Sequence, residues 1–293
     1  MRDLNEDTIT QEVLARQANA GDARLKEIMT SLVQHLHSFA REVKLTEAEW
    51  FQGIQFLTQT GHMCDDERQE FILLSDSLGL SMLVTALNNR KPQGCTEATV
   101  FGPFHVEDAP HYESGEDLGQ GVKGLPLYVN GRVTGFDGKP VAGAAIDIWH
   151  ADGFYDVQYA DNPAARGRGV MHSDAQGRFY FKTALPASYP IPHDGPVGKM
   201  LEALNRHPWR PAHVHFMIQA EGYERLVTHV FRDGDTYLDS DAVFGVRNSL
   251  IADWIEHSPG AAPDGLTLDT PFYTLDFEFV LNPAAGSAAR KAA

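Results

Sequence analysis

The sequence predicts a mainly β protein with an α-helical N-terminal region, in which an antiparallel β-sandwich follows the helices. Apolar residues recur at helical spacing through roughly the first ninety residues, and after Lys-Pro-Gln-Gly at 91–94 the chain changes to short alternating segments separated by turn-forming residues. These later segments recur regularly with little helix between them, which favours an antiparallel sandwich over a parallel α/β sheet.

The N-terminal region is expected to contain three helical segments. Apolar residues over 25–43 form one stripe at helical spacing, and Thr46 followed by Glu49 has the form of a capping box that opens a second helix. A third helical run covers residues 66–88 and is interrupted by Gly79. The first third of the chain is therefore predicted to be helical.

The β-rich region is expected to consist of short strands with one helix among them. Segments of suitable composition and alternation are 127–134, 145–149, 178–183, 213–220, 226–231 and 272–281. Apolar residues between 246 and 256 have helical spacing, so a helix is expected to interrupt the strands there.

Composition excludes several kinds of partner. The formal net charge of −16 argues against binding to nucleic acid or to an anionic membrane surface. No apolar run approaches the roughly 18 residues of a membrane span, and the first residues do not resemble a signal peptide, so a cytoplasmic protein with no membrane span is expected. Cys64 and Cys95 are too few for a disulfide framework and are interpreted as small hydrophobic residues.

A pair of histidines is the first candidate for chemistry. In Arg-Pro-Ala-His-Val-His-Phe at 210–216 the proline ends any helix, so His213 and His215 are expected on one face of a strand, with Cα atoms roughly 6.5 to 7 Å apart. That geometry suits a metal ion. An isolated His-x-His can equally line a half-buried strand face, and the pair alone leaves both interpretations open.

Two tyrosines in turn-rich segments are the next candidates. Tyr155 follows a strand through a turn that contains Gly153, and Tyr189 lies in a proline-rich loop. Two phenolates require a highly charged cation, because an unperturbed phenol ionises only at about pH 10, and ferric iron fits better than zinc, calcium or magnesium. Either tyrosine could instead be a wall residue with a hydrogen-bonded hydroxyl group.

Four motifs together resemble those of the intradiol ring-cleaving dioxygenases. They are Gly-Pro-Phe at 102–104, Trp-His-Ala-Asp at 149–152 leading to Tyr155, Tyr189 with the Ile-Pro-x-Asp-Gly-Pro-Val-Gly that follows at 191–198, and the histidine motif at 210–216. In length and layout the chain resembles the catechol and hydroxyquinol 1,2-dioxygenase group. The resemblance covers nearly the whole chain, including the helical region.

The resemblance implies one non-haem Fe(III) ion per subunit, held by Tyr155, Tyr189, His213 and His215. Tyr189 and His215 would be axial ligands, and Tyr189 would leave the iron and accept one of the two protons that the diol loses on binding. Arg210 matches the arginine that stabilises negative charge developing on the ring, although an arginine can equally serve in a structural ion pair.

The resemblance also implies the walls of a substrate pocket. These are Leu73, Asp76, Val100, Phe101, Gly102, Pro103, Phe104, Ile191 and Pro192, together with Arg210. Asp76 indicates the substrate, because a carboxylate beside apolar walls is costly unless it meets a hydrogen-bond donor, and a third ring hydroxyl group would supply one. Some chlorocatechol-cleaving relatives also carry an acid there, and Asp76 could instead pair within its helix.

His229 departs from the pattern of the catechol-cleaving members, which have glutamine at that position. Because the four-ligand set is complete without it, His229 is expected to be a hydrogen-bond partner near the metal and not a ligand. This departure weakens an assignment to catechol more than it supports hydroxyquinol.

The expected reaction is intradiol cleavage of hydroxyquinol (1,2,4-trihydroxybenzene) with O2 to 3-hydroxy-cis,cis-muconate or maleylacetate in aromatic degradation, with catechol or a chlorocatechol as alternative substrates. The resemblance implies a helical linker and dimerisation domain over residues 1–98 and a β-sandwich catalytic domain with the iron site over residues 99–293. It also implies a homodimer through the N-terminal helices, with a phospholipid at the interface.

Two other readings compete with this one. A cupin also carries His-x-His on a strand, but it needs a glutamate three or four residues after the second histidine, and Glu221 is separated from His215 by five residues. The non-enzymatic alternative is a lipid-binding or dimerisation module fused to a sandwich, which the apolar stripe of the first helix favours.

Overall fold

The computed structural model describes residues 4–66, 68–158 and 165–287, and the chain divides into two compact units, Met1–His62 and Met63–Ala293. The division falls earlier than the predicted domain boundary at residues 98 and 99. A compact unit is not the same as a functional domain, so that predicted boundary stays a prediction.

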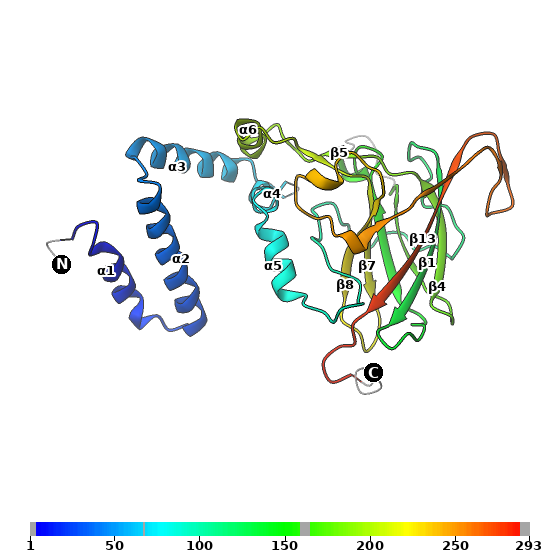
Figure 1. The fold of residues 1–293 in the computed structure, drawn as a ribbon, viewed down its shortest axis with the longest axis horizontal. Helices are drawn as coiled ribbons and strands as arrows, with labels where there is room; N and C mark the ends of the chain where they lie inside the picture. The colour runs from blue at the N-terminus through cyan, green and yellow to red at the C-terminus, as the bar shows by residue number, and fades with distance from the viewer. Residues whose placement is uncertain (1–3, 67, 159–164, 288–293) are drawn as a thin grey trace. The chain divides into compact units, whose positions relative to one another are not determined.

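The first unit is helical (Figure 1). It contains α1 (Ile9–Arg16), η1 (Gln17–Asn19), α2 (Ala23–Glu42) and α3 (Glu47–His62). The Asp22 side chain caps α2 by accepting hydrogen bonds from the backbone N–H groups of Arg24 and Leu25. The capping box predicted before α3 is confirmed, because the backbone N–H of Thr46 donates to Glu49 Oε2 at 2.9 Å and that of Glu49 donates to Thr46 Oγ1 at 3.3 Å.

The helices of the first unit leave an apolar surface uncovered. No residue of α2 is buried, and its apolar stripe is exposed at Leu25, Ile28, Leu32, Leu36 and Phe39. Further exposed apolar side chains on α3 are Trp50, Phe51, Ile54 and Leu57. Exposed apolar side chains at this density on a helix are typical of an interaction surface.

The second unit begins with two short helices, α4 (Glu70–Ser77) and α5 (Leu80–Asn88). The predicted interruption is confirmed at Gly79, which has the left-handed φ of 75° that glycine tolerates best. Among the described residues no single helix is long and apolar enough to cross a membrane; α4 and α5 meet the length and composition criteria only as a pair bent by 78°.

Two sheets form the sandwich that follows (Figure 1). The strands are β1 (Pro126–Gly135), β2 (Ala145–His150), β3 (Arg168–His172), β4 (Arg178–Ala184), β5 (Tyr189–Pro190), β6 (Trp209–Arg210), β7 (His213–Gln219), β8 (Leu226–Arg232), β9 (Ile251–Ala252), β10 (Ile255–His257), β11 (Gly260–Ala261), β12 (Thr267–Leu268) and β13 (Phe272–Leu281). One sheet has the order β10-β13-β1-β4 and the other β3-β2-β7-β8-β9, and β5-β6 and β11-β12 form two small ribbons. The predicted sandwich with N-terminal helices is confirmed, except that β1 pairs with β13 and β8 with β9 in parallel.

The core lies between the two sheets. On β7, Val214, Phe216 and Ile218 point into it and are fully buried against residues of the opposite sheet such as Leu275 and Phe279. Because side chains alternate along a strand, His213 and His215 point to the other face of the five-stranded sheet. The histidine pair therefore lies behind the core and is buried there by other segments of the chain.

Two local predictions were wrong or incomplete. Residues 246–256 do not form a helix, but instead η4 (Asn248–Leu250), then β9 and β10, which pair with β8 and β13 respectively. Pairing across the sheets here outweighs the local apolar spacing. The loop after Tyr189 contains a helix that was not predicted, α6 (Pro196–Ala203), with proline in the first turn, where its missing N–H costs nothing.

Candidate metal centre and substrate cavity

The two histidines of β7 lie side by side on one buried face of the strand. Both are almost completely buried, and their Nε2 atoms lie 3.2 Å apart. Burial lowers the pKa of both imidazoles well below the usual range, and Arg210 (for His213) and His229 (for His215) lower it further. Two neutral imidazoles with adjacent nitrogens at this distance need a shared proton or a cation between them, which supports the chelating interpretation of the pair.

The backbone fixes which nitrogen of His213 is free. Its Nδ1 lies 2.7 Å from the carbonyl oxygen of Pro211, an arrangement in which Nδ1–H donates and Nε2 keeps its lone pair. His215 differs, because its buried Nδ1 has no hydrogen-bond partner among the described residues. The imidazole of His215 is instead held by its neighbours in the sheet, Trp149 on one side and His229 on the other.

Both predicted tyrosines lie next to the histidine pair, Tyr155 from a loop and Tyr189 from the short strand β5, which pairs with β6. The hydroxyl oxygen of Tyr155 lies 3.4 Å from His213 Nε2, and its ring meets that of Tyr189 edge-on with centroids 5.3 Å apart. Tyr155 stands after the turn at Gly153, and Phe104 stacks on its ring at 4.6 Å. Burial raises the pKa of Tyr155 well above 10, so a nearby cation would be needed to ionise it at neutral pH.

A buried ion pair anchors the loop that carries Tyr155. The next residue, Asp156, accepts hydrogen bonds from the guanidinium of Arg168 on β3, and Arg168 also donates to the carbonyl oxygen of Phe104 at 3.0 Å. Arg168 thereby ties the Tyr155 loop to the Gly-Pro-Phe segment.

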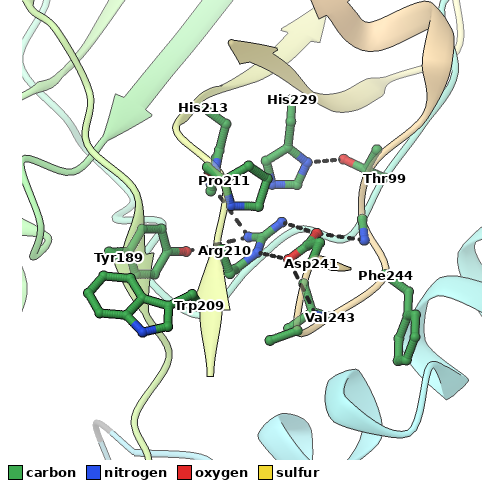
Figure 2. A network of polar contacts seen from close by, with 12 residues as sticks. Thr99, Tyr189, Trp209, Arg210, Pro211, His213, His229, Asp241, Val243 and Phe244 are labelled. Carbon is green, nitrogen blue, oxygen red and sulfur yellow. Dashed lines mark hydrogen bonds and ion pairs between the residues drawn. The ribbon is translucent and has the colours of Figure 1, made fainter. Parts of the chain in front are cut away.

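His229 completes a cluster of three buried histidines with His213 and His215, whose ligand atoms all lie within 4.8 Å of one another. Its Nδ1 forms a short hydrogen bond with the Thr99 hydroxyl group (Figure 2), whereas its Nε2 is buried and has no partner among the described residues. His229 stands opposite His215 in the ladder between β7 and β8. The partner Thr99 was not predicted, because 130 residues separate the two side chains.

The donor atoms gathered here fit a ferric ion. Two imidazole nitrogens and two phenol oxygens converge in a buried position, with Arg210 beside them, and phenolate oxygens favour ferric iron over softer or less charged ions. The available lone pair on His213 Nε2 agrees with a ferric ion at this position. So does Tyr155, whose phenol needs a nearby cation in order to ionise.

Arg210 is held by an aspartate that sequence reasoning missed. Its Nε donates to Asp241 Oδ1 at 3.0 Å and its Nη2 to Asp241 Oδ2 at 3.3 Å, while Nη1 points to the hydroxyl oxygen of Tyr189 at 3.4 Å (Figure 2). Burial disfavours the charged guanidinium, but the charge and hydrogen bond of Asp241 together with the two nearby tyrosines outweigh burial and raise the pKa of Arg210. No local motif marks Asp241, which lies 31 residues from its partner.

A cavity of about 690 Å³ lies beside α4 and the segment that follows Gly102. Its predicted wall residues are Leu73, Asp76, Pro103, Phe104 and Pro192, and the remaining walls are formed by Asp66, Arg68, Gln69, Glu70, Ile72, His105, Val157 and Gln158. Burial raises the pKa of Asp76 above its usual value, although the Ser81 hydroxyl group and Arg210 oppose that rise. His105, which was not predicted, pairs with Asp147 at 2.7 Å.

The other predicted pocket residues lie outside the cavity wall. Gly102 has a φ of 79° and packs so closely on His215 that a Cβ atom would lie 3.1 Å from its Cε1. Phe101 packs against His105 and Trp149, Ile191 packs in the buried cluster of Leu73, and Val100 is buried. The structure therefore brings only part of the predicted pocket into one cavity.

Comparison with known proteins agrees with this arrangement. A family model described as "Dioxygenase" matches residues 100–283, and one described as "Catechol dioxygenase N terminus" matches residues 22–96. The 6-chlorohydroxyquinol 1,2-dioxygenase of Cupriavidus pinatubonensis is 62% identical, covering 97% of this chain and 99% of that protein. The hydroxyquinol 1,2-dioxygenase of Nocardioides simplex is 50% identical, covering 95% and 96% respectively.

Solved structures give the same result. The hydroxyquinol 1,2-dioxygenase of Pseudomonas putida superposes with a TM-score of 0.90 at 49% identity, covering 95% of this chain and 99% of that chain. The catechol 1,2-dioxygenase of Pseudomonas arvilla superposes with a TM-score of 0.82 at 29% identity, covering 96% and 93% respectively. The chain therefore belongs to the intradiol ring-cleavage dioxygenases.

Proposed function

We propose that this protein cleaves hydroxyquinol between its two adjacent hydroxyl-bearing carbons, with O2, in aromatic degradation. The product is 3-hydroxy-cis,cis-muconate, the enol form of maleylacetate, and both oxygen atoms enter the product, so no external reductant is needed. The observation that carries the substrate assignment is Asp76, a buried carboxyl group in the wall of the cavity. A third ring hydroxyl group would give this carboxyl group the hydrogen-bond partner that catechol cannot provide.

We propose that Tyr155, Tyr189, His213 and His215 hold one ferric ion per subunit. When bound, this ion would act as a Lewis acid that binds the deprotonated diol. Tyr189 is suited to accept a substrate proton at its hydroxyl oxygen, because that atom lies within the candidate centre, 3.4 Å from Arg210 Nη1. Arg210 would then stabilise negative charge that develops on the ring.

The surrounding residues would exclude water and keep the donors in place. Trp149, Phe104 and Gly102 cover the histidines and Tyr155, and the Arg168–Asp156 pair holds the loop that carries Tyr155. We propose that His229 supports His215 through ring contact, with centroids 4.0 Å apart, and is not a ligand.

Oxygen uptake by the iron-loaded protein tests the substrate assignment. Hydroxyquinol, 6-chlorohydroxyquinol and catechol would be compared in parallel, with the autoxidation of each triol subtracted. Faster turnover of the triols than of catechol is expected. A preference for catechol would overturn the role of Asp76, and the absence of uptake on all three compounds would overturn the diol-cleaving function.

We also propose a homodimer in which the apolar surface of α2 and α3 is covered by a second copy, with a phospholipid at the interface. The exposed side chains of both helices support this proposal. Light scattering of Leu32→Glu, with Glu27→Gln as a control on the polar side, would show a monomer only for the first variant.

Mass spectrometry of an organic extract tests for lipid. The free, buried thiol of Cys95 supports a cytoplasmic location, which cell fractionation tests.

A further inference from the structure

The segment from Asp241 to Gly245 is built around the guanidinium of Arg210. The Asp241 side chain is 2% exposed and that of Arg210 is 4% exposed, and two hydrogen bonds join them (Figure 2). Such a two-point contact fixes the plane of the guanidinium as well as its position.

The carboxylate of Asp241 is itself fixed by its own segment. The backbone N–H of Gly245 donates to Oδ2 at 2.8 Å and that of Val243 to Oδ1 at 3.4 Å. The backbone N–H of Ala242 donates to the carbonyl oxygen of Trp209 at 3.2 Å, which ties the segment to β6 beside Arg210. Each oxygen of Asp241 thus has one partner in the backbone and one in the guanidinium.

Gly245 is the residue that allows this close approach. A Cβ atom at this position would lie 2.8 Å from Arg210 Nη2 and 3.0 Å from Asp241 Oδ2, closer than a carbon atom normally approaches either atom. Any side chain here would push the guanidinium away from Asp241.

The pairing leaves one nitrogen of Arg210 for the candidate centre. Nε and Nη2 are engaged by Asp241, and Nη1 lies 3.4 Å from both the Tyr189 hydroxyl oxygen and His213 Nε2. Asp241 is the acidic group that binds Arg210 among the described residues. Without it, the guanidinium would be free to rotate toward other acceptors.

We propose that Asp241 is a positioning residue, which together with Gly245 aims Arg210 Nη1 at Tyr189 and at the reacting ring without touching the substrate itself. The inference rests on the proposed function, because it assigns Arg210 its part in that reaction.

The test is a double-mutant cycle with Asp241→Asn and Arg210→Ala in the iron-loaded enzyme. Asp241→Asn is expected to lower kcat about 10- to 100-fold with little change in KM, and to cause no further loss in the Arg210→Ala background. Asp264→Asn, a carboxylate that pairs with Lys182, should leave kcat unchanged. Independent, multiplicative losses in the double variant would overturn the proposal.

A second measurement does not depend on turnover. In the iron-free protein labelled with ¹⁵N-arginine, the Arg210 Nε–H should exchange with solvent at least tenfold faster in Asp241→Asn than in wild type. Gly245→Ala keeps both charges and should also lower kcat, so it serves if Asp241→Asn does not fold. Wild-type exchange rates in both variants would overturn the proposal. If the Arg210 Nε–H exchanges slowly in the wild type but the wild-type enzyme does not turn over substrate, the result would count against the proposed function alone.

Discussion

The indole ring of Trp149 stacks on the imidazole of His215, with ring centroids 4.7 Å apart and planes within 15° of each other. The two residues are cross-strand partners on β2 and β7. Histidines that bind metals usually donate their second N–H to an acceptor, but the Nδ1 of His215 has no partner among the described residues. Stacking therefore replaces the missing hydrogen bond in orienting this ring.

Replacing Trp149 with leucine should loosen His215 and weaken iron binding about tenfold or more, measured by competition with a chelator. Trp254 is a matched control, because it is also buried and its indole nitrogen, like that of Trp149, has no partner in the described part of the chain, but Trp254 packs in the core between the sheets. Both variants should lose about 1–3 kcal/mol of stability. Equal iron affinity in the two variants would contradict the orienting role of Trp149.

Tyr155→Phe should abolish or shift the visible phenolate-to-iron charge-transfer band, because it removes one phenol oxygen from the candidate centre. The absorption spectrum of the iron-loaded protein measures this directly. Tyr128→Phe is the control, since the Tyr128 hydroxyl group donates to Asp264 and not to the candidate centre. An unchanged spectrum in Tyr155→Phe would show that this residue is not a ligand.

Asp76→Asn should lower kcat/KM for hydroxyquinol at least tenfold and that for catechol much less, because only the triol can donate to the carboxyl group. It should also stabilise the protein at neutral pH. Burial raises the folded pKa of Asp76 above 3.8, so wild-type stability falls as pH rises from about 3.8 through that raised pKa.

Chemical denaturation across this pH range measures the second effect. The stability gained by Asp76→Asn should grow through the window and then level off, whereas the exposed Asp269→Asn should show no such trend. Equal losses on both substrates would remove the assigned role of Asp76.

Acid should destabilise the iron-free protein through its buried histidines. Burial lowers the pKa of His150 from 6.5 to about 4. Between pH 6.5 and pH 4, His150 is therefore protonated in the unfolded chain but neutral in the folded chain. The resulting stability is present above pH 6.5 and is lost as pH falls toward 4, up to about 3 kcal/mol.

His150→Gln should remove part of this pH dependence, because glutamine can keep the hydrogen bond to Thr183 without titrating. The exposed His172→Gln should leave it unchanged. Denaturation curves at pH 7 and pH 5 give the comparison, and an identical pH dependence in wild type and His150→Gln would contradict the prediction.

Gly131→Ala should destabilise the sandwich by about 1–3 kcal/mol, because the added methyl group would lie 2.1 Å from the ring of the fully buried Phe179. Gly53→Ala is the matched control. It adds a methyl group in α3 with no atom within 4 Å, and should be neutral or stabilise by about 1 kcal/mol. Thermal unfolding that ranks the two variants the other way would contradict the packing described between β1 and β4.

Local periodicity predicted much of the fold because it reports which face of an element is buried. The strand at 272–281 was predicted with the bounds that β13 has, and alternation along β7 placed His213 and His215 on one face. The same rule failed at 246–256, where apolar residues at helical spacing are used by two short strands with different partners. Local spacing alone cannot distinguish these outcomes.

The residues of the candidate centre also differ in whether the sequence could predict them. Tyr155, Tyr189 and the histidines stand in recognisable motifs, whereas Asp241 and Thr99 carry no local signal and meet their partners only through the tertiary fold. Long-range polar contacts of this kind follow from the sheet register, which a single sequence does not specify.

The parallel pairing of β1 with β13 has a consequence for how the protein is made. Leu127 stands opposite Tyr273 and Gly135 opposite Leu281. The residues of β1 are therefore synthesised long before those of β13, with which they pair. Pairings of such large sequence separation slow folding, because a long loop must close before the contact forms. Until Phe272–Leu281 leaves the ribosome, one edge of β1 stays open, and a chain truncated before residue 272 should aggregate during translation instead of folding to a smaller sandwich.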